Sequence, residues 1–308
     1  MKISKVEWPT AILILVIYLG LHFNCLYIYE ISSTLFTILL AFLIASHSSI
    51  SHEILHGHPT KNDYLNSIFV FPAVGIFIPF LRFKDTHLEH HKNENLTDPY
   101  DDPETNFIDP NTWKKLGYFV QFTLNLNNTL LGRMLIGPFI SQYKFIKSEI
   151  EFLFNENERV ILAWIMHFFG FSVAYYFFVI FHKVGFVHWI IGAYAALSIL
   201  KIRTFLEHRA FNRARGRSVI IEDTGILALI FLNNNFHAVH HIHPKIPWYI
   251  LPRIFKENKR RYLALNDYYY FKSYLDVFKS YFFVGKDPVA HPYYANRSSA
   301  SKNNKNAQ

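Results

Sequence analysis

The most informative segment of this sequence is a cluster of histidines that follows three asparagines. It reads Asn233-Asn234-Asn235-Phe236-His237-Ala238-Val239-His240-His241. Its last five residues form an HxxHH pentad, and the same pentad occurs at residues 87–91. On a helix, residues i, i+3 and i+4 share one face, so each pentad would present three imidazoles together. A chain that is otherwise largely apolar has little structural use for such sets, which favours metal ligation.

A third cluster, residues 52–58, reads HEILHGH and places His52 and His56 on one helix face. His58 is a possible substitute for His56, although Gly57 would end the helix before it. The three clusters together supply eight convergent histidines, whereas one zinc ion takes only four ligands. The ligand count therefore indicates two metals, and imidazole leaves their identity open among iron, copper, zinc and nickel.

The first cluster taken alone has a second interpretation. Residues 52–56 match HExxH, the zinc metalloprotease motif, in which Glu53 would be the general base. A protease would not need the other two clusters, so the set as a whole favours a shared metal centre.

The composition is typical of a polytopic membrane protein. Of 308 residues, 51% are hydrophobic, with 31 Phe and 19 Tyr. We expect one integral membrane domain over residues 1–290, because the clusters must meet, and a disordered tail over residues 291–308. The one cysteine, Cys25, excludes intrachain disulfides and cysteine-based metal clusters. The net charge of +8 comes mainly from residues that flank apolar runs, which favours a membrane surface over nucleic acid.

Four apolar runs are long enough to cross a bilayer: residues 9–29, 34–50, 159–181 and 185–205. Lys2 and Lys5 precede the first run, so both termini and all three clusters are expected on the cytoplasmic side. Residues 65–83 contain Pro72, Gly75 and Pro79 and are expected to be re-entrant or interfacial. Residues 112–140 are expected to form interfacial helices. The fold expected is all-α, with about four transmembrane helices, interfacial helices and a cytoplasmic histidine cap.

These clusters, taken with four spans, resemble the three histidine boxes of the membrane fatty acid desaturase and hydroxylase superfamily. The likeness covers roughly residues 35–255, and the third box resembles its bacterial desaturase-like branch. It implies a cytoplasmic non-haem di-iron centre, with a ninth ligand between the second and third boxes. Phe205-Leu206-Glu207-His208 occupies that place in this sequence. The ligands implied are His52, His56, His87, His90, His91, His208, His237, His240 and His241.

The resemblance also implies the chemistry and the partners. The reduced irons would activate O₂ and remove hydrogen from a long-chain fatty acyl lipid, giving a double bond. Electrons would come from a separate ferredoxin-like or cytochrome-type donor. Glu207, Asp98 and Asn234 are expected to support the ligands, although either acid could pair with an arginine and Asn234 could cap a helix.

Two alternatives stay open. Hydroxylases and ketolases acting on lipids, alkanes or carotenoids share the box plan. A metal-binding membrane protein without redox activity, such as a transporter, is the rival of another class. Its ligands would lie near the bilayer midplane rather than at the ends of spans.

Overall fold

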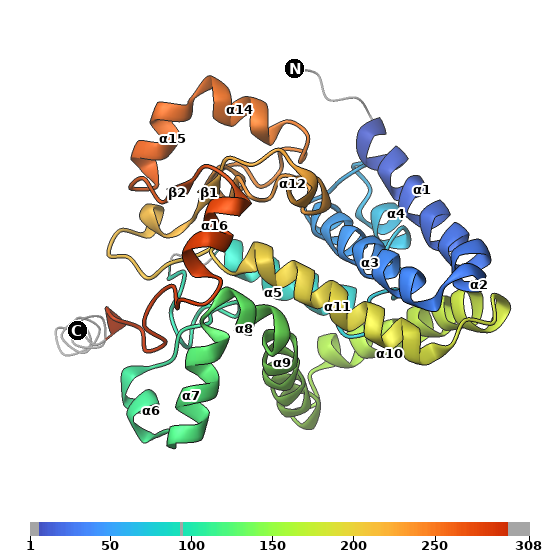
Figure 1. Cartoon of the computed structure of the whole chain (residues 1–308), viewed down its shortest axis with the longest axis horizontal. Helices are drawn as coiled ribbons and strands as arrows, with labels where there is room; N and C mark the ends of the chain where they lie inside the picture. Colours follow the sequence, from blue (N-terminus) through green and yellow to red (C-terminus); the bar gives the residue numbers. More distant parts are fainter. Residues whose placement is uncertain (1–5, 93–94, 295–308) are drawn as a thin grey trace.

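The chain folds into a bundle of long apolar helices joined to a smaller cap. A computed structural model describes residues 6–92 and 95–294. The first span runs through α1 (Trp8–Phe23), η1 (Asn24–Ile28) and α2 (Tyr29–Ile31), and α3 (Ser33–Leu55) returns. The second hairpin consists of α10 (Glu158–Ala174) with η2 (Tyr175–Phe181), followed by α11 (Phe186–Thr204). Among the described residues, these are the four helical stretches long and apolar enough to cross a membrane, as predicted (Figure 1).

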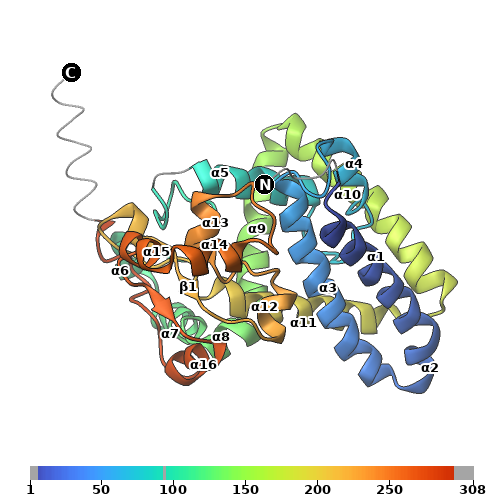
Figure 2. The ribbon, with the colours of Figure 1, turned by 90° about the horizontal axis from the view of Figure 1, so that it is seen from above.

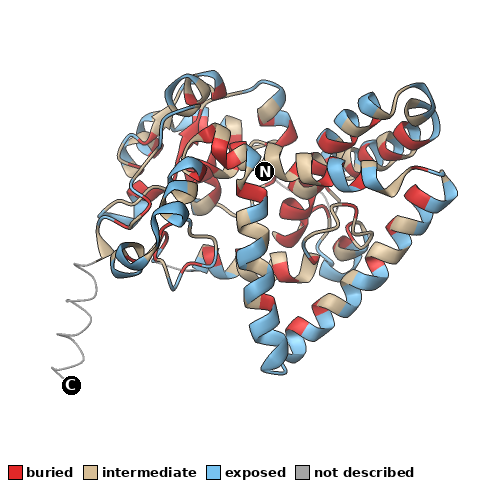
Figure 3. Ribbon diagram, turned by 60° about the horizontal axis from the view of Figure 1, so that its bottom comes forward, coloured by how far each residue is buried: buried red, intermediate tan, exposed pale blue. Residues whose placement is uncertain are grey.

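The burial pattern of the spans is that of a protein surrounded by lipid. On α1, Ile14, Ile17 and Leu21 face the bundle, whereas the large side chains on its other face, such as Ile12 and Leu15, are more than half exposed. In Figure 3 the outer faces of the long helices are exposed over most of their length. In water such surfaces would be unfavourable, so the bilayer is the solvent that fits them.

Close packing joins the two hairpins at α3 and α11. A Cβ atom at Gly192 of α11 would lie 2.7 Å from Cδ2 of Leu40 of α3, so a larger residue there would require the Leu40 side chain to shift. Gly170 of α10 similarly touches the backbone of Phe71. Small residues at such crossings let membrane helices approach closely.

The segment predicted to be re-entrant is not one of the four spans. It begins in α4 (Asp63–Ile68), continues without helix over residues 69–79 and ends in α5 (Phe80–Lys92). Its backbone is covered by the second hairpin: Ala73 N donates to Gly170 O at 3.1 Å, and Trp189 Nε1 donates to Val74 O at 3.0 Å. Irregular backbone at membrane depth needs such partners. The segment therefore brings α5 back to the end of α3.

Residues 110–154 form four helices beside the bundle: α6 (Pro110–Lys115), α7 (Tyr118–Asn127), α8 (Leu130–Leu135) and α9 (Gly137–Phe154). Both α8 and α9 pack against α11. Aromatic side chains on α7, among them Tyr118 and Phe119, are strongly exposed. Short helices with exposed apolar faces are typical of the membrane interface.

The remaining chain forms a cap against one end of the bundle (Figure 2). Its helical elements are η3 (Ala214–Arg217), α12 (Ile226–Ile230), α13 (His237–Ile242), α14 (Leu251–Glu257), α15 (Lys259–Leu265) and α16 (Tyr274–Tyr281). Strands β1 (Ile220–Ile221) and β2 (Tyr270–Phe271) pair in parallel, with Ile220 opposite Tyr270. Phe236, Val239 and Phe255 form a small separate core under α13. That core fixes the helix that carries the third histidine box.

The end of the described chain is packed on the acidic loop that follows α5. His291, where the predicted tail begins, is buried, and its Nε2 lies 3.1 Å from the hydroxyl of Thr97. Residues 295–308 of that predicted tail lie outside the described residues.

Candidate metal centre

The first histidine box lies where α3 ends. His52 is in the last turn of the helix and His56 is its C-cap residue, so the two side chains follow one another along one face. Their ring centroids are 4.8 Å apart. His58 has a different environment, because its Nδ1 atom lies 2.7 Å from the carboxylate of Glu7. The structure thus places His56, and not His58, beside the other histidine boxes.

The second and third boxes lie on α5 and α13, and each pentad is divided between two groups of imidazoles. The first histidine group comprises His52, His56, His87, His91 and His240. The second histidine group comprises His90, His208, His237 and His241. In each pentad the i and i+4 residues enter one group and the i+3 residue enters the other. The i, i+3 and i+4 spacing predicts that each pentad presents its three imidazoles together. In the structure, each pentad instead joins the two groups.

The spacing of the ring nitrogens within each group fits a metal ion. One ligand atom from every member lies within 4.8 Å of the others. Neighbouring Nε2 atoms are closer: His90 to His208 at 2.9 Å, and His91 to His87 at 3.0 Å. Metal–nitrogen bonds of about 2.1 Å at right angles would put two ligand nitrogens about 3 Å apart.

Hydrogen bonds alone cannot satisfy these nitrogens. The Nε2 atom of His237 is 3.1 Å from that of His208 and 3.0 Å from that of His241. An imidazole nitrogen carries either one proton or one lone pair, so it serves one such partner and not two. Among the described residues, the buried Nε2 atoms of His52 and His56 have no hydrogen-bond partner at all. A cation in each group would satisfy all of these lone pairs.

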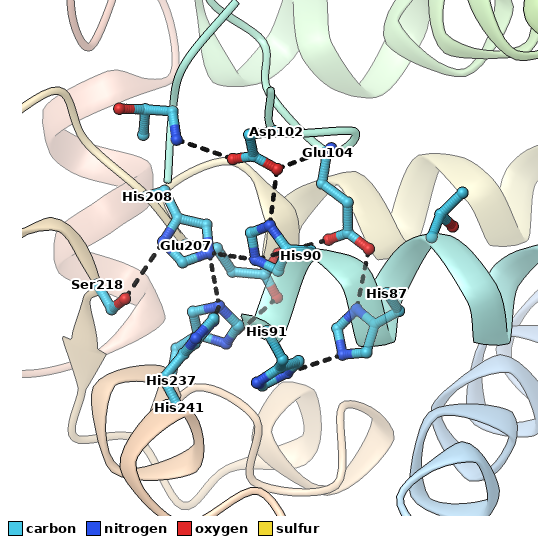
Figure 4. A network of polar contacts seen from close by, with 12 residues as sticks. His87, His90, His91, Asp102, Glu104, Glu207, His208, Ser218, His237 and His241 are labelled. Carbon is cyan, nitrogen blue, oxygen red and sulfur yellow. Dashed lines mark hydrogen bonds and ion pairs between the residues drawn. The ribbon is translucent and has the colours of Figure 1, made fainter. Parts of the chain in front are cut away.

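Carboxylates and other polar groups hold the opposite ring nitrogens, as Figure 4 shows. The Nδ1 atom of His87 lies 2.9 Å from Glu104, and that of His90 lies 2.8 Å from Asp102. A carboxylate accepts the Nδ1 proton and leaves Nε2 free to ligate. Asp102 also accepts hydrogen bonds from the backbone N–H groups of Thr97 and Glu104, which fixes its position.

The second group has two further supports. His208 Nδ1 lies 3.2 Å from the hydroxyl of Ser218, and His237 Nδ1 donates to Asn234 Oδ1 at 3.2 Å. Glu207 lies 3.8 Å from His237 and forms an ion pair with Arg203 at 3.0 Å. Glu207 therefore lies beside His237 and is also paired with an arginine, so its role as a support for a ligand stays a prediction.

Burial keeps most of these imidazoles neutral, which is the form that binds metal. Burial and the neighbouring imidazoles lower the pKa of His56 to about 2 and that of His91 to about 3. The pKa values of His208, His237, His240 and His241 lie well below the usual range for the same reasons. His90 differs: burial lowers its pKa, but Glu104 and Asp102 more than offset this and raise it to about 9.

The acid predicted to support a ligand from the loop after α5 is Asp98, which lies close in the sequence to the acids that contact histidines. Asp98, expected to support a ligand, accepts hydrogen bonds from the backbone N–H groups of Tyr100 and Asp101. The carboxylates bonded to histidines belong to Asp102 and Glu104 in the same loop. Several acids follow the second box closely, and the sequence alone does not say which one turns inward. Asn234 contacts both His237 and Glu207 rather than capping α13.

Comparison with known proteins agrees with this geometry. The family model described as "Fatty acid desaturase" matches residues 31–274. The chain belongs to this family. This desaturase-family chain is also 25% identical, over 223 residues, to the beta-carotene ketolase of Paracoccus sp. (strain PC1), which covers 70% of the chain and 74% of that relative.

Family and structure together establish the coarse function. The chain is an integral membrane oxidoreductase of the desaturase and hydroxylase type, with a histidine cluster able to hold metal. The resemblance drawn from the histidine boxes is thereby confirmed.

Proposed function

We propose that residues 1–290 form a single membrane enzyme that uses O₂ and external electrons to desaturate a long-chain fatty acyl substrate. The observation that carries this proposal is the pair of adjacent histidine groups at the end of an apolar bundle. The groups are in contact, because the rings of His91 and His241 stack at 4.3 Å. A pair of neighbouring redox-metal sites can supply the electrons that O₂-dependent attack on an unactivated C–H bond needs.

Nine imidazoles would hold two iron ions in this proposal. When bound and reduced, the irons supply activation of O₂ and removal of hydrogen from carbon. The surrounding residues orient these ligands: Glu104 and Asp102 hold the Nδ1 protons of His87 and His90. Burial of His52, His87 and His240 keeps bulk water away from the first group.

The stoichiometry of the reaction defines how many electrons and protons the protein must receive. Forming one double bond removes two hydrogens from the acyl chain, and two further electrons and two protons convert O₂ to two waters. We propose that a separate ferredoxin-like or cytochrome-type donor supplies the electrons. The positive flanks of the spans favour a cytoplasmic position for both termini and the histidine cap, where such a donor would dock.

A second candidate reaction is oxygenation, in which an alcohol or a ketone forms at the same carbon. The similarity to a beta-carotene ketolase favours it. Desaturation and oxygenation differ only in the fate of the carbon after the first hydrogen is lost, so both fit the same metal centre.

Product analysis tests the proposal. Lipids from cells expressing the chain, with and without a reductase and ferredoxin pair, would be compared by mass spectrometry. We expect acyl chains that have lost two hydrogens, and only when O₂ is present. A gain of oxygen on an acyl chain or a carotenoid would assign the second candidate instead.

The rival without redox activity makes a different prediction. A metal transporter would yield no O₂-dependent product, and its purified form would bind zinc or another cation as readily as iron. Protein that contains no iron, or iron without any oxidised product, would therefore reject the proposed function.

A further inference from the structure

The backbone around His208 leaves the carbonyl of this residue for a side chain to bind. His208 lies after the end of α11, opposite Ser218 in an isolated antiparallel bridge. The two backbone hydrogen bonds of the bridge belong to the flanking residues. They run from Val219 N to Glu207 O at 3.1 Å and from Arg209 N to Arg217 O at 2.9 Å. His208 and Ser218 are therefore a non-hydrogen-bonded pair, and their own N–H and C=O groups point away from the bridge.

Lys286 supplies the donor for this carbonyl. Its Nζ atom donates to His208 O at 2.9 Å, and no backbone N–H among the described residues does so. The rings of Phe107 and Phe205 lie 5.9 Å and 5.7 Å from the ammonium, which restricts where it can move. A hydrogen bond from a charged donor is stronger than one between neutral groups. The carbonyl of a candidate metal ligand is thus held by a distant lysine.

The segment that carries Lys286 is itself fixed to the rest of the fold. It follows α16, and residues 282–291 are called the C-terminal strap below; they belong to the red end of the chain in Figure 1. The backbone N–H of Lys286 donates to Asn128 O at 3.2 Å, and Asn128 Nδ2 donates to Asp287 O. Because Asn128 ends α7, the lysine reaches His208 from a fixed point.

The far end of the C-terminal strap is fixed to the acidic loop that follows α5. Ile108 N donates to Val289 O at 3.0 Å, and His291 N donates to Ile108 O at 2.9 Å. Buried His291 also contacts the hydroxyl of Thr97 through Nε2, at 3.1 Å. The same loop carries the two carboxylates that are bonded to ligand histidines. The strap therefore joins that loop to the backbone of a further ligand.

His208 needs such a contact more than the other members of its group do. His90, His237 and His241 lie on α5 and α13, where helix geometry sets the direction of a side chain. His208 lies outside any helix, and the contact of its Nδ1 atom with Ser218 orients the ring rather than the backbone (Figure 4). Ligands must be held within about 0.5 Å of the productive geometry, so a rotated peptide would misplace the ring nitrogen.

We propose that Lys286 is a positioning residue of the second histidine group: its ammonium holds the His208 carbonyl and so places the His208 imidazole against the other three ligands. This inference rests on the metal centre of the proposed function and adds a residue from outside the ligand set. Removal of the ammonium would leave the carbonyl without its donor, and the peptide would turn toward another donor or water.

Cobalt titration of the purified full-length protein tests this role without turnover. The His240→Ala background removes a ligand of the first group and leaves the second intact, and His237→Ala does the reverse. In the His240→Ala background, Lys286→Met should weaken Co²⁺ binding by about tenfold and change the absorption spectrum of the bound ion. In the His237→Ala background, the same substitution should leave the Co²⁺ affinity within about twofold.

Two matched variants separate positioning from folding. Lys286→Arg keeps a charged donor and should restore the Co²⁺ affinity of the second group to within about twofold. Lys279→Met removes an exposed lysine from α16 and should have no effect on either group. A role in folding alone would lower the melting temperature of Lys286→Met and leave the affinity and spectrum of Co²⁺ in the second group unchanged. That result, or equal losses of affinity in both backgrounds, would overturn the inference.

A second variant covers the case in which Lys286→Met does not fold. Asn128→Ala loosens the C-terminal strap and leaves the lysine in place. It should weaken Co²⁺ binding in the second group by about fivefold, as expected for the loss of one neutral hydrogen bond. An unchanged affinity in this variant would also overturn the inference.

The outcome is separable from that of the proposed function. A loss of Co²⁺ affinity confined to the second group, in a protein that yields no oxidised product when unaltered, would reject the reaction and keep the role of Lys286. An oxidised product from the unaltered protein, together with unchanged Co²⁺ binding in Lys286→Met, would do the reverse.

Discussion

The two histidine groups use the same kind of ligand but are positioned by different means. Four of the five members of the first group lie on or at the end of the long helices α3 and α5. Of these five, His87 has a hydrogen-bonded carboxylate partner on Nδ1, whereas the buried Nδ1 atom of His91 has no hydrogen-bond partner among the described residues. In the second group, His90, His208 and His237 each have a polar partner on Nδ1.

This difference follows from where the ligands lie in the chain. A long helix fixes its side chains through backbone geometry, so the first group needs few polar supports. His208 follows the end of α11 and His237 begins the short helix α13, so hydrogen bonds must set their ring orientations. The first group should therefore depend less on hydrogen bonding, which holds His87 through Glu104, than the second group does.

Removal of one ligand from each group should produce the largest effect. His240→Ala and His237→Ala are both expected to lower turnover by at least ~1,000-fold, because both metals serve one reaction. Iron analysis should show that each variant still inserts and retains iron in the intact group. Full activity in His240→Ala would remove the third box from the metal site.

Substitution of the carboxylate partners should separate the groups. Asp102→Asn should weaken metal binding in the second group by about 10- to 100-fold and leave the first nearly unchanged. Glu104→Gln should weaken the first group through His87 and also affect the second, because the charge of Glu104 acts on His90 as well. Metal titrations of the purified variants measure this. Asp101→Asn, an exposed neighbour in the same loop, is the control. Equal losses of metal affinity in the two groups of Asp102→Asn would contradict the difference in hydrogen bonding between them.

The pH dependence of metal binding should also differ. With a pKa of about 9 in the metal-free protein, His90 carries a proton at neutral pH that a metal must displace. Affinity in the second group should therefore fall by about tenfold for each pH unit below about 9. His56 and His91, with pKa values of about 2 and 3, impose no such loss at neutral pH. His237→Ala leaves the first group intact and His240→Ala leaves the second group intact. Parallel pH profiles of metal affinity in these two variants would refute the expected difference.

Loss of the neutral partner of His208 should have the smallest effect. Ser218→Ala removes a hydroxyl at 3.2 Å and is expected to weaken the second metal by about threefold, since such a bond contributes about 1 kcal/mol or less. Ser198→Ala, whose hydroxyl donates to Tyr194 O on α11, serves as the control. A loss of metal affinity as large as that of Asp102→Asn would show that the charge of the hydrogen-bond partner does not matter here.

Much of the fold could be predicted from the sequence because the bilayer imposes simple rules. Span length, apolar runs and proline positions gave the four spans and the irregular segment between α3 and α5. The division of each pentad between two groups was not predictable from spacing alone. It depends on how α5 and α13 face one another, and the small core around Phe236 and Phe255 positions α13 for that contact.

The supporting residues were harder to predict than the histidines. Glu207 and Asn234 lie next to or near a ligand in the sequence, and both contact His237 in the structure. Asp102 and Glu104 lie in a loop with several acids, where the turn at Thr97 decides which carboxylate points inward. Thr97 adopts a left-handed backbone conformation with φ of 73°, which sequence periodicity does not reveal.

We propose that two metals are bound, one in each histidine group. Anomalous diffraction at the iron edge, from crystals of the iron-loaded protein, tests it most directly. Two peaks are expected, one among His52, His56, His87, His91 and His240 and one among His90, His208, His237 and His241. A single peak, or iron bound outside these groups, would contradict the account.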